Sequence, residues 1–427
     1  MVKLRRTRIL VAIGLVSLAR ASSASDSDEP AVLTLREAVA AVLRDNPTLA
    51  AMSSEIGARE AQVLQAGLLP NPALSVEVEN FGGTGDREAF EQTETTLMLS
   101  QVLELGGKRG RRQDVHRLGR DLVDFDYESQ RLALSVETAK AFIATLAAQE
   151  RNDLAVELED AVALAVDTIR AQVRSGGAAE IELARVKVVA SRVRVAHTDA
   201  ERALGANRNA LATLWGAPRA EFSRVAGDLA VLPPVPPRDE LLTRTMGNPD
   251  MARWTLELEE RSASVALAKA EAIPNLTVSA GARHFSNNGD NAFIVEIAVP
   301  LPIFNRNQGA IEEAHSRLGM ARARRDATER EIRTMVIGAY ERLVAARDRA
   351  VQLRDDVLPD ARAVRDLALE NYRNGLFRYL DVFDAAQTFV ELSTEYIRSL
   401  EAAHIAAADI ERLTAAPLGA TFEGAQP

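Results

Sequence analysis

The side chains in this sequence that could carry out chemistry are few, and most of them are carboxylates. The 427 residues include no cysteine, which excludes disulfides, thiolate metal sites and a cysteine nucleophile. The five histidines are scattered and no two stand four residues apart, so no zinc site is visible. Phosphate-binding loops, dinucleotide-binding loops and nucleophile elbows are also missing. We therefore expect no catalytic residue, no metal site, no cofactor and no enzyme.

Two aspartates near a late glycine are the most suggestive polar residues. Asp381 and Asp384 follow Gly375 by six and nine residues, and a spacing of three puts both carboxylates on one face of a helix. Such a pair could attract cations. The same residues could equally be solvated helix residues, and Asp381 could cap its helix. The choice depends on the elements that position them.

The first residues have the composition of an export signal. Basic residues precede an apolar run of 11 residues, and small residues end at Ala24, which predicts a signal peptide over residues 1–24. The run is too short to span a membrane as a helix. Removal of this segment takes away five positive charges and no acid, so a net charge of −10 becomes −15. A chain this acidic is not expected to bind nucleic acid.

The rest of the chain reads as two copies of one unit. Asn46-Pro47 recurs 202 residues later as Asn248-Pro249, and Pro70-Asn71 recurs 204 residues later. Self-similarity at one offset indicates an internal repeat. We place repeat 1 at 33–218, a proline-rich linker at 219–237, repeat 2 at 238–417 and a tail at 418–427.

Each repeat is predicted to hold the same elements in the same order. A helix of about 30 residues comes first, over 34–67 and again over 239–272. A β-hairpin follows, at 74–101 and 276–299. Two long helices then turn at glycines, at 175–178 and 374–377. The segment from Gly107 to Val173 contains no proline, and as one helix it would reach roughly 100 Å, which is too long for a globular core.

The hairpin strands alternate apolar and polar side chains. Leu74 and Val76 oppose Ser75 and Glu77, and the strand after Phe293 repeats the pattern. This is typical of membrane strands around a polar lumen. An ordinary hairpin packed on helices would show it too, but the export signal and the long helices favour the membrane. Four strands cannot close a barrel, and open edges are not tolerated in lipid, so we expect strands to be shared between chains. A dimer would give eight strands, and a trimer twelve and room for a pore.

With these features the chain resembles the TolC family of outer-membrane efflux proteins, over about residues 33 to 417. The resemblance is carried by "AGLLPNPALSVEVEN", "ETTLMLSQVLELGGKR", "VPLPIFNRNQG" and "YRNGLFRYLDVFDA", and the second and third segments are most similar to the CzcC-type branch, which serves heavy-metal efflux. It implies a mainly α-helical homotrimer, with a twelve-stranded transmembrane β-barrel in the outer membrane of a Gram-negative bacterium and a helical tunnel in the periplasm. It also implies a periplasmic adaptor and an inner-membrane pump of the RND type as partners.

The resemblance also implies roles for residues at the tunnel tip. Asp381 and Asp384 match the family's aspartate pair, and threefold symmetry would make each of them a ring at the gate. Tyr372, three residues before the glycine, matches the gate tyrosine. The glycine turns at Gly176 and Gly375 would dock the adaptor.

The rest of the gate matches less well. In repeat 1 the residues after the glycine turn that correspond to the aspartates are Glu182 and Arg185. The family's arginine is expected two residues after the second glycine, where this chain has Phe377, with Arg378 next. The residues that would hold the gate closed are therefore not assigned by the resemblance.

Other functions remain as alternatives. A drug-efflux or type I secretion conduit would have the same fold, and a periplasmic coiled-coil scaffold would be soluble where the conduit needs detergent. An exported hydrolase has no nucleophile and base in the sequence to support it. The substrate, the pump and adaptor, and the open or closed state are not specified by the sequence.

Overall fold

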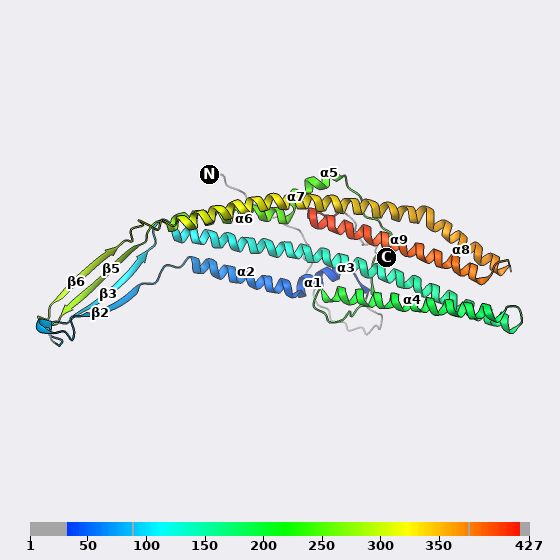
Figure 1. Ribbon diagram of the computed structural model, residues 1–427, viewed down its shortest axis with the longest axis horizontal. Coiled ribbons are helices and arrows are strands. Elements are labelled where there is room, and N and C mark those ends of the chain that lie inside the picture. The colour runs from blue at the N-terminus through cyan, green and yellow to red at the C-terminus, as the bar shows by residue number, and fades with distance from the viewer. Residues whose placement is uncertain (1–31, 88, 375, 419–427) are drawn as a thin grey trace, which may run out of the picture.

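The structure is a computed structural model that describes residues 32–87, 89–374 and 376–418. The molecule is long and thin, with a β-sheet at one end and a bundle of helices that extends to the other (Figure 1). The predicted signal peptide, Gly375 and nearly all of the predicted tail lie outside the described residues. Among the described helices, none is both long enough and apolar enough to cross a membrane.

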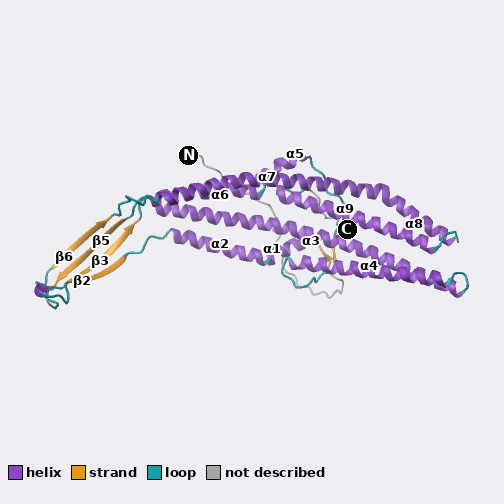
Figure 2. Cartoon of the chain, viewed as in Figure 1, coloured by secondary structure: helices purple, strands orange, loops and turns teal. Residues whose placement is uncertain are grey.

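The two halves of the chain contain matching elements. The first half contains β1 (Val32–Leu33), α1 (Leu35–Asp45), α2 (Pro47–Ala66), β2 (Ala73–Glu79), a short 3-10 turn (Gly85–Arg87), β3 (Glu94–Leu103), α3 (Lys108–Arg174) and α4 (Glu180–Thr213). The second half contains β4 (Arg224–Val225), α5 (Arg238–Arg244), a 3-10 turn (Thr245–Gly247), α6 (Pro249–Glu271), β5 (Leu276–Phe285), β6 (Asn291–Ala298), α7 (Gln308–Gln352), a π-helical turn (Leu353–Val357), α8 (Leu358–Arg373) and α9 (Tyr379–Thr414). Figure 2 shows the strands gathered at one end and the helices along the rest.

The first helix of each repeat is divided, where the sequence predicted one continuous helix. Asn46 has ψ 123° and Asn248 has ψ 131°, both extended, and each precedes a proline that begins the next helix. A residue before proline is pushed out of the helical region by the proline ring, which accounts for the break. Each asparagine side chain then caps the new helix, since Asn46 accepts from Thr48 N–H at 2.9 Å and Asn248 from Asp250 N–H at 2.7 Å.

The same two asparagines connect the beginning of each repeat to its end. Asn46 Nδ2 donates to the carbonyl of Leu214 at 2.7 Å, and Asn248 Nδ2 donates to that of Leu413 at 2.8 Å. The carbonyl acceptors lie at or near the last turn of α4 and α9. The repeated Asn-Pro pair therefore performs one structural task twice.

The two hairpins form a single antiparallel sheet in the order β2-β3-β5-β6, so the repeats meet where β3 pairs with β5. Val76, Leu97, Ala282 and Phe293 lie side by side across the four strands. Their face is open: Val76 is 64% and Phe293 is 96% exposed. The middle of this face is thus apolar and has no partner among the described residues.

The opposite face of the sheet is polar and internally bonded. The Arg283 guanidinium donates to Thr96 Oγ1 at 2.9 Å and forms ion pairs with Glu94 at 2.8 Å and Glu79 at 3.2 Å. Thr96 is buried under this group. The strand register thus places the apolar and polar side chains on opposite faces, as the alternation in the sequence predicted.

The main core lies midway along the helical bundle. Helices of both repeats meet there with the linker, and small residues on α3 allow them to approach closely. The largest buried side chains of this core are Phe142, Ile143, Leu146, Leu211, Leu229 and Leu400. The short parallel pair of β1 and β4 fixes the linker to the strand that precedes α1.

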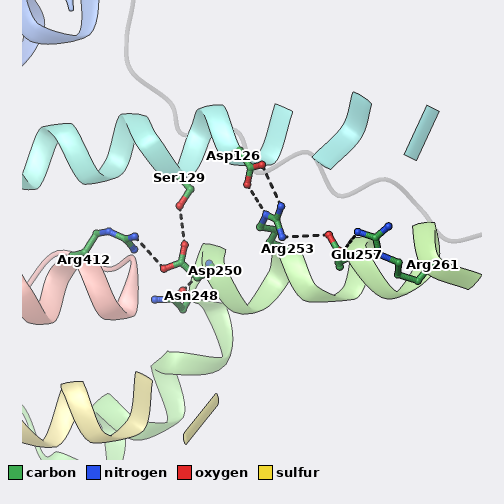
Figure 3. A network of polar contacts seen from close by, with 8 residues as sticks. All are labelled: Asp126, Ser129, Asn248, Asp250, Arg253, Glu257, Arg261 and Arg412. Atoms are coloured by element: carbon green, nitrogen blue, oxygen red, sulfur yellow. Dashed lines mark hydrogen bonds and ion pairs between the residues drawn. The ribbon is translucent and has the colours of Figure 1, made fainter. Parts of the chain in front are cut away.

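A polar network joins α6 of the second repeat to α3 and α9 (Figure 3). Asp250 accepts from Ser129 Oγ at 2.8 Å and from the Arg412 guanidinium at 3.0 Å. One turn further along α6, Arg253 pairs with Asp126 at 2.5 Å. These contacts fix the helix that leads into β5 against the long helix of the other repeat.

Candidate functional site

The residues predicted to form a gate lie at the end of the molecule farthest from the sheet, where the turns between α3 and α4 and between α8 and α9 lie at the same end of the bundle (Figure 1). Gly176 has φ +78°, a left-handed conformation that favours glycine. Gly176 N–H donates to the carbonyl of Val173 at 3.1 Å and Gly177 N–H to that of Gln172 at 2.8 Å, so these two carbonyls near the end of α3 have partners. The matching bond in repeat 2 runs from Leu376 N–H to Asn371 at 2.9 Å.

The two aspartates have different surroundings although they lie three residues apart. Asp381 accepts from the backbone N–H of Arg378 at 2.9 Å, and the Arg378 guanidinium lies 3.9 Å from the same oxygen. Asp381 therefore caps the beginning of α9, which is one of the two roles that the sequence suggested for it. Asp384 makes no hydrogen bond or ion pair with any residue that the structure describes, and its carboxylate is exposed.

Both aspartates line a groove that runs along α8 and α9. The groove has a volume of about 670 Å³, and two further carboxylates, Asp356 and Asp360, lie along it. Apolar residues such as Val364 line the rest. Sequence reasoning missed Asp356 and Asp360; their spacing of four residues was the only available signal, and the π-helical turn that presents Asp356 has no simple sequence pattern.

This groove can attract cations but is not built as a tight metal site. In the parts of the chain that the structure describes, no three histidines or acids are grouped so that they could hold a metal ion. Two of the histidines have other partners: His197 Nδ1 lies 2.5 Å from Glu159, and His404 Nε2 lies 2.9 Å from the carbonyl of Leu229.

Two tyrosines fix the helices next to the aspartates. Tyr372 and Tyr379 pack edge to face with ring centroids 5.7 Å apart, and the Tyr372 hydroxyl is buried without a hydrogen-bond partner among the described residues. Burial, and then the proximity of Tyr372, raises the pKa of Tyr379 to about 12. Tyr379 also packs against Val166 and Val186, so it joins the two helical hairpins. No pattern in the sequence singles out Tyr379.

The remaining predicted gate residues form local pairs within one subunit. Arg185 lies 3.5 Å from Glu182, one turn away on α4, and Arg378 pairs with Asp381 as described above. Within the described residues, no hydrogen bond or ion pair joins the α4 pair to Asp381 or Asp384. The structure of one chain therefore brings Glu182 and Arg185 together, and Arg378 and Asp381 together, but does not link these two pairs.

Comparison with known proteins identifies the type of molecule. The family model described as "Outer membrane efflux protein" matches residues 38–217 and again 245–416, one match for each repeat. The cobalt-zinc-cadmium resistance protein CzcC of Cupriavidus metallidurans is 29% identical over 89% of this chain and 90% of its own. The nickel-cobalt-cadmium resistance protein NccC of Alcaligenes xylosoxydans xylosoxydans is 25% identical over 76% of this chain and 73% of its own.

Solved structures share the fold at low sequence identity. The Campylobacter jejuni CmeC outer membrane channel superposes with a TM-score of 0.73 at 15% identity, covering 93% of both chains. CusC, described as forming a transmembrane channel, superposes with a TM-score of 0.71 at 17% identity, covering 89% of this chain and 91% of its own. The predicted family and the mainly helical fold with two sets of strands are thereby confirmed. The chain belongs to the outer membrane efflux protein family and is an efflux channel, not an enzyme, of the outer membrane of Gram-negative bacteria.

Proposed function

We propose that three copies of this chain form a passive conduit that carries divalent heavy-metal cations out of the cell. The observation that carries this proposal is the four-stranded sheet, which has one open apolar face and a polar face on the other side. The chain contributes the channel, and a pump in the inner membrane contributes the energy.

The sheet supports assembly because its outer strands, β2 and β6, each have a strand neighbour on one side alone. In lipid, the free edges would leave backbone N–H and C=O groups unpaired, which costs several kcal/mol for each group. Pairing β6 of one copy with β2 of the next removes every free edge. Three copies give twelve strands around a lumen lined by the Arg283 face.

The helical tips support a preference for cations. In a trimer, Asp381 and Asp384 would contribute six carboxylates to one mouth, and Asp356 and Asp360 would extend the negative surface along the groove. Within one chain, Arg378 is the one basic side chain paired with any of these four aspartates among the described residues. A ring of carboxylates favours cations over anions in a narrow channel.

The names of the relatives support the class of substrate. CzcC and NccC are named for resistance to cobalt, zinc, cadmium and nickel. Other relatives are named for export of pyoverdine and toluene, at 26% and 23% identity. A conduit for organic compounds is therefore the second candidate, and the 29% identity to CzcC over 89% of the chain favours the first.

The turns at the tips are the proposed contact with a periplasmic adaptor, which would connect the conduit to an RND-type pump. Gly176 presents a bare backbone turn in repeat 1, with no heavy atom near the position of a Cβ. In repeat 2, Leu376 is 73% and Phe377 is 44% exposed at the corresponding place. Apolar side chains at the end of a helical hairpin suit a protein partner.

The proposal can be tested by deleting the gene in its own bacterium. We expect the deletion strain to lose growth in zinc, cobalt or cadmium salts at concentrations that the parent tolerates, and a plasmid copy of the gene to restore it. Growth with toluene and with detergents is measured in parallel. A strain that is sensitive to organic compounds and fully resistant to metals would contradict the metal assignment and support the second candidate.

A further inference from the structure

The apolar face of the sheet continues past the end of β6. The strand ends at Ala298, but exposed apolar side chains recur at every second position beyond it, at Val299, Leu301 and Ile303. Phe304 follows and is 90% exposed. A segment that only connected a strand to a helix would have no reason to keep the period of a strand or its apolar side.

Two prolines lower the number of backbone N–H groups in this segment. Pro300 and Pro302 have no N–H group to satisfy, and the N–H of Ile303 donates to the carbonyl of Leu301 at 2.9 Å. Asn307, at the beginning of α7, donates its side-chain amide to the carbonyl of Ala268 at 2.7 Å. The prolines and the Ile303 bond reduce the number of free backbone donors where the regular ladder has ended, and the N–H groups of Val299, Leu301, Phe304 and Asn305 have no partner among the described residues.

The other three connections between strands and helices expose apolar side chains at the same level of the molecule. Leu68 and Leu69 precede β2, Leu105 follows β3, and Ile273 precedes β5, and their side chains are between 42% and 63% exposed. Figure 1 shows all four connections at the same end of the sheet. We call this set, with Leu301 and Phe304, the junction collar.

Unpaired arginines lie directly next to the junction collar. Arg109 and Arg111 are in the first turn of α3, and Arg306 lies two residues before α7. All three are exposed, and their guanidinium groups form no hydrogen bond or ion pair with a described residue. The nearby Arg112 is different, because it is paired with Glu104 at 2.8 Å. Apolar side chains followed by free guanidinium groups match the order of acyl chain and phosphate in a lipid leaflet.

We propose that the junction collar inserts into the periplasmic leaflet of the outer membrane and that Arg109, Arg111 and Arg306 bind phospholipid phosphate groups. The inference rests on the outer-membrane location of the sheet. It adds a lipid contact that lies beyond the regular strands and fixes how deep the channel sits. Free phosphate has the same anionic chemistry, so the experiment must separate the two sources.

Depth in the membrane is tested with a tryptophan probe in the full-length protein. The Phe304→Trp variant is reconstituted in vesicles of phosphatidylethanolamine and phosphatidylglycerol that contain lipids with brominated acyl chains. Its fluorescence is compared with that of the parent protein. We expect bromine to quench the added fluorescence. Leu376→Trp, at the far tip and 73% exposed, is the control and should show no quenching.

A second control separates failure of this inference from failure of the membrane assignment. Val295→Trp lies on the apolar sheet face and should be quenched. If position 295 is quenched and position 304 is not, the junction collar lies outside the lipid and the inference is wrong. If neither is quenched, the membrane placement of the sheet is itself contradicted.

The phosphate contact is tested by native mass spectrometry of the detergent-extracted protein. Arg109→Gln with Arg306→Gln should lose bound phosphatidylglycerol, whereas Arg324→Gln with Arg325→Gln, two exposed and unpaired arginines further along α7, should retain it. Equal retention by both double variants would overturn the assignment. Displacement of the lipid by millimolar inorganic phosphate would point to a site for free phosphate instead.

Discussion

Asp381 and Asp384 show how two like residues on one helix face can have different tasks. The spacing in the sequence predicts the shared face. It does not predict which of the two carboxylates accepts a hydrogen bond from the backbone. In the structure, Asp381 accepts from the N–H of Arg378 at 2.9 Å, while Asp384 has no partner among the described residues. The first therefore contributes to stability and charge, and the second to charge alone.

This difference predicts a split between stability and selectivity. Asp381→Ala should lower the free energy of unfolding by about 1 kcal/mol, because one hydrogen bond at an exposed helix end is lost. Asp384→Ala should leave stability unchanged. Thermal unfolding of both variants measures this, and equal destabilisation would contradict the assignment of the cap.

The conductance of the channel tests the shared charge. In a planar bilayer, the double variant of Asp381 and Asp384 to alanine should remain a folded trimer but lose cation selectivity and block by divalent cations, because its mouth has lost six carboxylates. Asp160→Ala with Asp167→Ala, on α3, is a control for removal of charge elsewhere. A double variant with the selectivity and block of the parent would show that the aspartates are ordinary solvated residues.

Glu150 on α3 should make stability depend on pH near neutrality. Burial, and then the carboxylates of Asp228 and Asp153, raise the pKa of Glu150 to about 7 from an ordinary value of 4.5, and Arg151 opposes the shift. Between these two values the folded chain holds a proton that the unfolded chain has released, so stability falls as the pH rises through this window. Melting temperatures measured across this pH range should therefore fall less for Glu150→Gln than for the parent. A variant with the same pH profile as the parent would contradict the role of Glu150.

At the scale of elements, the sequence predicted what depends on local periodicity. The apolar positions of α3 repeat with the period of a helix and those of β5 with the period of a strand, and both elements form where these patterns are strongest. The helix break at Asn46 was missed, although the residue before Pro47 was a visible signal. The bond from Asn46 to Leu214 could not be predicted, because it joins residues 168 positions apart.

This bond leads to a prediction for the repeated asparagines. Asn248→Ala removes a helix cap and leaves the carbonyl of Leu413 without its donor, so it should lower stability by about 1–3 kcal/mol. Asn374→Ala, at an exposed turn, is the matched control and should have little effect. Chemical denaturation of the two variants side by side gives the comparison. If Asn248→Ala is as stable as the parent, the bond to Leu413 does not explain why the Asn-Pro pair occurs in both repeats.

At the scale of the whole molecule, the repeat explains why one chain contains two similar hairpins. Each repeat contributes one hairpin to the sheet and one helical pair to the tip, and the pairing of β3 with β5 joins them. The sequence predicted this organisation because the Asn-Pro and Pro-Asn pairs recur in the same order at nearly one offset. It could not predict the groove that brings Asp356 and Asp360 to the aspartates of α9, because that depends on how α8 and α9 pack.

The two faces of the sheet should respond differently to charge. Val295→Arg puts a cation on the open apolar face, where near the middle of a bilayer it should cost roughly 2–4 kcal/mol. Thr277→Arg, on the opposite face of the neighbouring strand, should be tolerated much better. The yield of assembled protein in the outer membrane fraction measures both, and equal losses would reverse the assignment of the faces.

The most direct test of the account is the mass of the full-length protein extracted from membranes in detergent. The central claim is that β2 and β6 are completed by other copies of the same chain, so one chain cannot form the channel alone. We expect a stable trimer that needs detergent to stay in solution. A stable monomer, or a protein that stays dissolved without detergent, would contradict the claim.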